Sequence, residues 1–272
     1  MCIRDSLYEK PFGMSIAGTA ETVSSLSREK VVELFNSIYS TNHMIFSVVG
    51  KVEWEDVLEE AKKFPANTKK IEPLPIVKKF AELMEKRKGI DQAHEVLGFH
   101  MPRLIDKNRY AAEIFDSILG GGMSSRLFQE IREKRGLAYY ISTHSEVNPD
   151  TGYLVSYAGV DHKKINEVVS LILEEYKKIK EKDLSKKEVE RAKEYLKGRL
   201  RLSLEESENV ASFYGSQELL ENRILTPEEK IKEIEKVTPG DIKEVGKEIF
   251  MKNKLNLAVI SPYHRTFKHF SI

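Results

Sequence analysis

The sequence contains very little cysteine. Cys2 is the single cysteine among 272 residues. One thiol cannot build an internal disulfide framework, and it excludes a zinc site made of several cysteines. Because proteins of reducing compartments carry few disulfides, this composition favours a cytoplasmic protein.

Neither sign of charge is in excess, and no long apolar segment is present. The 44 basic residues nearly balance the 43 acidic ones, which leaves a formal net charge of +1. Nucleic-acid-binding domains are usually strongly basic, and no apolar run reaches the roughly 18 residues of a membrane-spanning helix. We therefore expect neither a nucleic acid nor a membrane as a partner.

The sequence does contain enough apolar residues for a substantial core. Hydrophobic residues make up 40% of the chain, which is sufficient for one large or two ordinary domains. Charged residues make up 32%, and the lysine and glutamate runs over 177–201 predict solvated helix faces with spaced charge pairs.

One unit of the sequence occurs twice. Residues 26–50 align without gaps with residues 237–261. Ser27 coincides with Thr238 as a helix cap, and Asn42 coincides with Asn253 in a turn. The apolar positions Val31, Leu34, Ile38, Met44, Phe46 and Val48 coincide with Ile242, Val245, Ile249, Leu255, Leu257 and Val259. Each copy predicts a capped amphipathic helix, a turn and a buried strand, so two homologous domains are indicated.

The two copies are preceded by unequal lengths of sequence. A whole domain fits between Pro73 and Thr238, whereas only residues 1–26 precede Ser27. We expect the first copy to close a domain of which only the C-terminal part is present, with apolar residues such as Phe35, Phe46 and Val48 poorly covered. The opening MCIRDS joins no periodic pattern and looks like translated sequencing adapter.

The second domain shows the patterns of both strands and helices. Residues 93–101 read as a strand, 107–119 and 124–136 as helices, and NPDTG as the turn of a hairpin. Ser185 with Glu188 and Thr226 with Glu229 predict capped helix starts. The fold class is therefore α+β, as two homologous two-layer domains in which helices cover a mostly antiparallel sheet. The expected boundaries are 1–6 adapter-derived, 7–70 first-domain remnant, 71–85 linker, 86–262 second domain and 263–272 tail.

The segment LGGGMSSRLFQEIREKRGLAYY, together with LGFHMPRLIDKNRYAAEIFDSI before it and LTPEEKIKEIEKVTPGDI after it, resembles the second domain of a zinc metallopeptidase superfamily. This superfamily comprises insulinase, pitrilysin and mitochondrial processing peptidase. The stretch PFGMSIAGTAETVSSLSREKVVELFNSIYSTNHMIFSVVG is similar to the end of its first domain. The resemblance covers nearly everything from Leu7 to Pro262, and it implies two similar domains that close around an unfolded peptide.

The resemblance also implies where the zinc belongs. Members bind zinc in the first domain through H-x-x-E-H on a helix, and this chain lacks that motif. His94 with Glu95 and His100 is the nearest imitation, but a strand separates its histidines by about 20 Å. We therefore expect zinc in the intact parent protein, no metal on this chain, and no activity of the chain alone.

Two residues match positions at which the second domain of this superfamily contacts substrate beside the zinc. Arg132 and Tyr139 have the required spacing of seven, and a guanidinium and a phenol can donate to the oxyanion of peptide hydrolysis. Gly120, Gly121 and Gly122 predict a structural turn near the domain interface rather than an anion site, because they lack a phosphate-loop lysine. The residues Tyr140, His144 and Arg135 remain open between a chamber lining and ordinary surface.

The expected function is that of a fragment of a zinc metalloendopeptidase, which supplies the substrate-binding half. Its expected partners are a peptide substrate and a zinc-bearing domain or subunit of the same family. The alternatives are a non-catalytic partner subunit of a heterodimeric processing peptidase and a purely structural relative. The presence of Arg132 and Tyr139 argues against the last of these.

Overall fold

The structure of the protein, a computed structural model, describes residues 4–64, 68, 70, 72–182, 184–221 and 223–263. The chain forms two compact units. The sheet unit consists of Met1–Met14, Ile76–Lys197 and Ile231–Ile272, and the helical unit of Ser15–Pro75 and Gly198–Lys230. Of the expected tail, all but Tyr263 lies outside the described residues. The expected adapter-derived segment contributes to the short helix α1 (Arg4–Leu7), in which Ser6 is buried.

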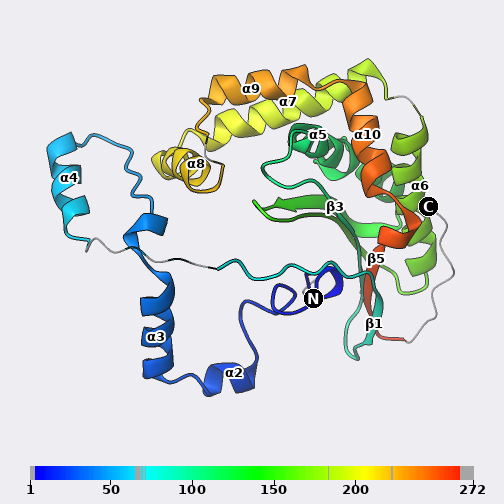
Figure 1. Ribbon diagram of the computed structural model, residues 1–272. Coiled ribbons are helices and arrows are strands. Elements are labelled where there is room, and N and C mark those ends of the chain that lie inside the picture. The colour runs from blue at the N-terminus through cyan, green and yellow to red at the C-terminus, as the bar shows by residue number, and fades with distance from the viewer. Residues whose placement is uncertain are drawn as a thin grey trace. The chain divides into compact units, whose positions relative to one another are not determined.

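The sheet unit is built on five strands in the order β1-β5-β2-β4-β3 (Figure 1). They are β1 (Glu82–Lys86), β2 (Ala93–His100), β3 (Ala138–Val147), β4 (Gly152–Val160) and β5 (Asn256–Ser261). Only the β1–β5 pair is parallel among these strands. The predicted strand at β2 and the hairpin β3–β4 are confirmed, whereas β1 begins inside the stretch expected to be a linker.

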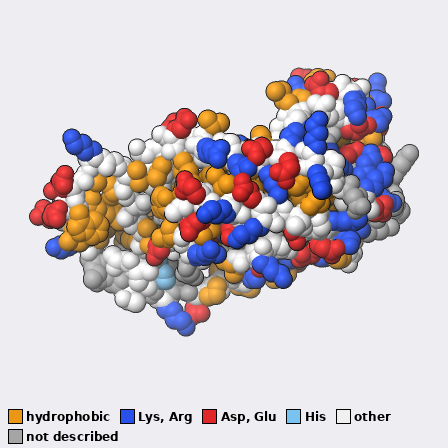
Figure 2. Space-filling model, turned by 90° about the horizontal axis from the view of Figure 1, so that it is seen from above, with side chains coloured by type: hydrophobic (Ala, Val, Ile, Leu, Met, Phe, Trp, Pro, Cys, Tyr) orange, Lys and Arg blue, Asp and Glu red, His pale blue; other side chains and the backbone are white. Residues whose placement is uncertain are grey.

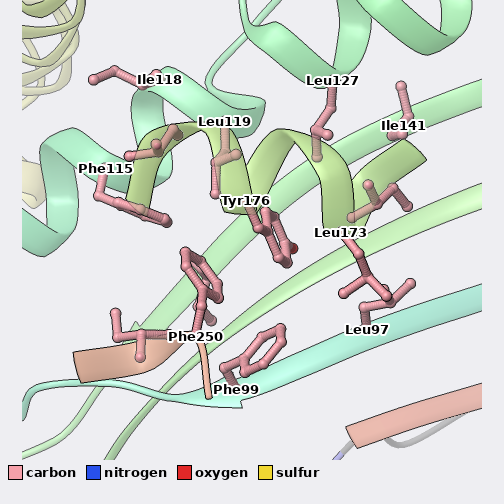
Figure 3. Packing of buried hydrophobic residues seen from close by; sticks show 14 of the residues in the cluster. Leu97, Phe99, Phe115, Ile118, Leu119, Leu127, Ile141, Leu173, Tyr176 and Phe250 are labelled. Atoms are coloured by element: carbon pink, nitrogen blue, oxygen red, sulfur yellow. The ribbon is translucent and has the colours of Figure 1, made fainter. Parts of the chain in front are cut away.

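One face of the sheet is covered by helices. The helices α5 (Arg109–Gly120), α6 (Ile165–Glu181) and α10 (Pro239–Ile249) pack over it (Figure 1). Figure 3 shows the core between the layers, where Phe250 lies against Phe99, Phe115 and Tyr176 at ring-centroid distances of 4.9, 4.9 and 4.4 Å. The expected two-layer α+β architecture with a mostly antiparallel sheet is therefore confirmed for this unit.

The other face of the sheet carries much less cover. Leu7 and Tyr8, from the chain's first residues, form a small buried cluster there with Tyr153 and Val155. Because successive residues of a strand point to opposite faces, this cluster and the main core use alternate positions of β4.

The helix starts follow the predicted caps with one difference. Thr226 and Glu229 bond reciprocally at the start of α9 (Pro227–Lys236). Ser185 Oγ accepts from the Glu188 backbone N–H at the start of α7 (Lys186–Ser203). The Glu188 carboxylate does not complete the reciprocal pair, because it binds Arg126 instead.

The charged runs lie on helix surfaces, as predicted. Lys178 pairs with Glu174 at 3.1 Å and Lys197 with Glu194 at 2.6 Å. Acidic and basic side chains are interspersed over the face shown in Figure 2. None of the helices in the described part of the chain has the length and apolar character that a bilayer span requires.

The helical unit contains α2 (Ala20–Ser24), α3 (Arg28–Ile38), the short helix η1 (Thr41–His43), α4 (Trp54–Lys62) and α8 (Ser207–Leu220). Ser47 Oγ donates to the Ala211 carbonyl at 2.9 Å and so ties two distant segments together. Residues 44–49 belong to no strand, so the strand predicted for the first repeat copy is wrong. The expectation that Phe35, Phe46 and Val48 are poorly covered is confirmed, since all three are exposed.

Candidate functional site

Arg132 lies on a short π-helix. The predicted helix after Ser124 is present, and its central part is η2 (Phe128–Glu133). The Lys134 N–H donates to the Gln129 carbonyl at 3.0 Å, which is the five-residue spacing of a π-helix. Because Leu127 and Ile131 are fully buried, the helix is anchored on one side. Arg132 is exposed on the other.

A tight turn joins this helix to β3. Gly136 has φ +62°, a conformation that favours glycine. Its N–H donates to the Arg132 carbonyl, and the Leu137 N–H donates to the Ile131 carbonyl, both at 3.0 Å. The helix stop predicted at Gly136 is confirmed. The chain thus turns back so that the start of β3 lies beside the last turn of η2.

Tyr139 is the extra residue of a β-bulge at that start. Ala138 pairs with Val160 and Tyr140 pairs with Gly159, so Tyr139, which lies between them, has no partner residue in β4. A bulge of this kind redirects side chains at the edge of a sheet. Tyr139 is 61% exposed, and its hydroxyl makes no hydrogen bond within the described part of the chain.

Arg132 differs from the cations around it. Lys134 and Arg135 pair with the Glu130 carboxylate at 2.9 and 2.7 Å, and these bonds lower the pKa of Glu130 to about 2. Arg132 makes no ion pair with the residues described, and its guanidinium carbon lies 5.0 Å from the centre of the Phe128 ring. Its donors therefore remain available to a ligand.

The segment that carries Arg132 is held in place by a partly buried ion pair. Arg126 Nε and Nη2 donate to the two Glu188 carboxylate oxygens at 2.7 and 2.9 Å. Glu175 of α6 lies 3.9 Å from the same guanidinium. A two-pronged bond of this type fixes orientation as well as distance, so η2 is held against both α6 and α7.

The three glycines form a packed turn at the end of α5. A side chain at Gly120 would clash with the Thr143 backbone nitrogen, because its Cβ would lie 2.1 Å away. After Gly121, the Gly122 carbonyl accepts from the Ser125 N–H at 3.1 Å. These contacts support the expected structural turn. Its place near a domain interface stays a prediction.

The sequence left undecided whether Tyr140, His144 and Arg135 line a substrate chamber or belong to the ordinary surface. In the structure, these residues have three different environments. The Tyr140 hydroxyl lies 2.7 Å from His94 Nδ1. Both residues are on the face of the sheet opposite α5, α6 and α10, which we call the open face. Arg135 is tied to Glu130, and His144 is exposed on β3 opposite Val155. The structure adds Tyr157 and Arg87, which the sequence analysis missed and which line one pocket with His94 and Tyr140. Tyr157 could have been found from the alternation of side chains along β4, which places it on the same face of the sheet as Val155.

The two strand histidines have separate partners, in agreement with their expected separation. His94 bonds Tyr140, whereas His100 Nε2 lies 3.3 Å from the Lys79 carbonyl. Burial lowers the pKa of His100 to about 4. Over the described ranges, no three His, Cys, Asp or Glu side chains come together in a group that could hold a metal ion. The described residues do not fit zinc.

Glu95 is a buried carboxyl whose lack of a partner was not visible in the sequence. It is fully buried on the helix-covered face of β2, and neither carboxylate oxygen has a hydrogen-bond partner in the described structure. Desolvation raises its pKa well above the ordinary value.

Comparison with known proteins identifies relatives that match most of the chain. The family described as "Peptidase M16 inactive domain" matches residues 25–196. The chain is 30% identical over 252 residues to the uncharacterized zinc protease YmxG of Bacillus subtilis, covering 92% of this chain and 61% of that protein. An uncharacterized zinc protease of Streptomyces coelicolor is 27% identical over 277 residues, covering 96% of this chain and 60% of its own length.

Solved structures share the fold. The peptidase M16 inactive domain from Pseudomonas fluorescens superposes with a TM-score of 0.84 at 18% identity, covering 96% of this chain and 64% of that one. A protease from Helicobacter pylori gives a TM-score of 0.79 at 19% identity, with coverage of 95% and 64%. The chain spans about 60% of the length of the curated relatives it matches.

Proposed function

The chain belongs to the peptidase M16 family, in which it matches the inactive domain, and from this we propose that it is the substrate-binding half of a zinc metallopeptidase. Arg132 and Tyr139 are its peptide-contacting residues. The observation that carries the proposal concerns the two arms of one turn, which expose the Arg132 guanidinium and the Tyr139 hydroxyl, neither of which has an ion-pair or hydrogen-bond partner among the described residues.

The chemistry suits the residues. Hydrolysis of a peptide bond places negative charge on the former carbonyl oxygen, and donors aimed at that oxygen lower the barrier. A guanidinium donates from a rigid planar fork, and a phenol donates a single proton. The anchors beneath them, Arg126 with Glu188 and the tight Gly136 turn, hold the donors in place before the substrate arrives.

The remaining parts of the site belong to a partner. The described residues lack a metal site, so zinc is assigned to another domain of the family, in the same polypeptide or a second one. We assign residues 7–70 to the end part of that first domain and 86–262 to the second domain, with the linker of 71–85 reaching into β1. The single cysteine supports a cytoplasmic location.

Peptide binding by the chain itself tests the proposal. A fluorescein-labelled, unstructured peptide is titrated with the wild-type protein and with Arg132→Ala and Tyr139→Phe, and anisotropy reports the Kd. Loss of a charged hydrogen bond is worth about tenfold in affinity, so we expect Arg132→Ala to weaken binding by that factor and Tyr139→Phe by less.

Arg135→Ala is the matched control. Arg135 is an exposed arginine three residues away whose guanidinium is already bound to Glu130, so its loss should leave the Kd unchanged. Equal weakening by Arg132→Ala and Arg135→Ala, or no peptide binding at all, would contradict the assignment.

A further inference from the structure

The open face of the sheet contains a pocket that the proposed function does not use. Its volume is about 440 Å³, and its apolar floor includes Val96 and Val155. His94, Tyr140 and Tyr157 line it as well. Tyr140 directly follows Tyr139 on β3, so the pocket begins one residue away from the proposed peptide contact.

Three rings stand next to one another in this pocket. The rings of His94 and Tyr140 are nearly parallel, at 27° with centroids 6.2 Å apart, and those of Tyr140 and Tyr157 are 6.1 Å apart. The 2.7 Å hydrogen bond between His94 Nδ1 and the Tyr140 hydroxyl fixes the first pair. Fixed rings above an apolar floor favour the binding of a flat aromatic group. The reason is that an aromatic pair contributes more binding free energy than its buried area alone provides.

Charge does not favour an ionic guest. Arg87 also lines the pocket, but its guanidinium pairs with Glu85 at 2.7 Å. The pair is close to neutral as a whole, so it offers neither a free cation nor a free anion. An uncharged side chain therefore suits the pocket better than an acidic or basic one.

The neighbouring part of the same face is already covered by another segment of the chain, Leu7 at the end of α1 and Tyr8 directly after it. The Lys79 N–H donates to the Leu7 carbonyl at 2.8 Å, and the Glu9 N–H donates to the Val77 carbonyl at 3.0 Å. Between these bonds, the chain places the Leu7 and Tyr8 side chains against the sheet, where both are buried.

Val155 connects that occupied part to the pocket. It packs with Leu7 and Tyr8 in the small cluster and also forms part of the pocket floor. A bound peptide can therefore place a side chain in the pocket, next to the position that Tyr8 occupies.

We propose that this pocket is a subsite for an uncharged aromatic side chain of the bound peptide. The inference rests on the proposed function, because it assumes that the peptide held by Arg132 and Tyr139 continues along the open face of the sheet.

Two labelled peptides test the subsite. One unstructured peptide contains a single tryptophan, and its matched version has alanine there. Because an aromatic pair adds to the binding free energy, the wild-type protein should bind the tryptophan peptide about fivefold more tightly than the alanine peptide. Tyr157→Ala should remove this difference, and Tyr157→Phe, which retains the ring, should preserve it.

Two further variants secure the result. His94→Ala removes another ring of the pocket and repeats the test if Tyr157→Ala does not fold. Tyr263→Ala removes an exposed tyrosine outside the pocket and should preserve the fivefold preference.

The outcomes separate the two proposals. Equal binding of both peptides to wild type, or a preference that survives Tyr157→Ala and His94→Ala, overturns the subsite. If Arg132→Ala still weakens binding in that case, the proposed function stands. If neither peptide binds to wild type, both proposals are overturned.

Discussion

The two copies of the repeated unit begin alike and end differently. Ser27 Oγ accepts from the Lys30 N–H and Thr238 Oγ1 from the Asp241 N–H, and each cap starts an 11-residue helix. Each helix leads into a short 3₁₀ turn, η1 or η3 (Lys252–Lys254). After that turn, the second copy forms the buried strand β5, whereas residues 44–49 of the first form none.

The difference lies in what surrounds each copy. β5 pairs with β1 on one side and β2 on the other, and Leu257 at its centre is fully buried. Phe46, at the matching position, is 53% exposed. Caps and turns depend on hydrogen bonds within a few residues, but a strand needs neighbours to pair with and a core to cover it. The capped helix and the turn of the unit are therefore determined by the unit's own sequence. The strand forms only where neighbouring strands and a core are present.

Hydrogen exchange should give the largest contrast between the copies. Amides of Asn256–Ser261 should exchange only on opening of the whole sheet unit, whereas those of 45–50 should exchange almost as freely as in an unfolded chain. The predicted ratio of protection is at least about 1,000. Limited proteolysis should likewise cut before about residue 75. Equal protection of both segments would break the comparison.

Matched aromatic truncations should give the next largest contrast. Phe250 is fully buried among three rings, so Phe250→Ala should lower the free energy of unfolding by about 3–5 kcal/mol. Tyr39, at the matching position, is exposed and stacks only on Phe35 in the described structure. Tyr39→Ala should change the free energy of unfolding by less than about 0.5 kcal/mol. Urea denaturation followed by circular dichroism measures both.

Glu95 lies beside the second copy, opposite Val259. Because burial raises its pKa in the folded state, its contribution to stability is fully present below the unfolded pKa and is lost as the pH rises toward the folded one. Glu95→Gln should therefore raise the free energy of unfolding at pH 7 by about 1–3 kcal/mol. The gain should shrink as the pH falls toward 4.5, the ordinary pKa of this group. A gain that does not vary with pH would show that ionisation is not its cause.

The helix caps should give the smallest contrast. Thr238→Ala removes the hydroxyl that accepts from the Asp241 N–H and donates to the Asp241 carboxylate, and it should destabilise the sheet unit by about 1 kcal/mol. Ser27→Ala should leave the same thermal transition nearly unchanged, since no side chain of α3 is buried. If both variants lower the melting temperature equally, the first copy contributes more to the cooperative fold than its exposure indicates.

Much of the sheet unit could be predicted because its signals are periodic. The helix expected over 107–119, observed as α5, and the hairpin around Asn148 follow from spacing and turn residues alone. β1 was missed because an edge strand exposed on both faces has no apolar alternation. The strand of the first copy was predicted wrongly because its apolar pattern is correct, but no strand in the described part of the chain pairs with it.

The candidate site was only partly predictable. The spacing of Arg132 and Tyr139 is visible in the sequence, but their exposure depends on a π-helix and a bulge, which arise from tertiary packing. The same holds for Glu188, whose spacing from Ser185 predicted a cap and whose carboxylate binds Arg126 from a distant segment.

Steady-state hydrolysis tests the central assignment most directly. The chain is supplied with a zinc-bearing first domain of its family, and cleavage of a quenched fluorescent peptide is followed for wild type, Arg132→Ala and Arg135→Ala. Loss of a donor to the oxyanion should lower kcat by about 100- to 1,000-fold in Arg132→Ala with little change in KM, while Arg135→Ala stays at the wild-type rate. A wild-type kcat in Arg132→Ala would contradict the assignment.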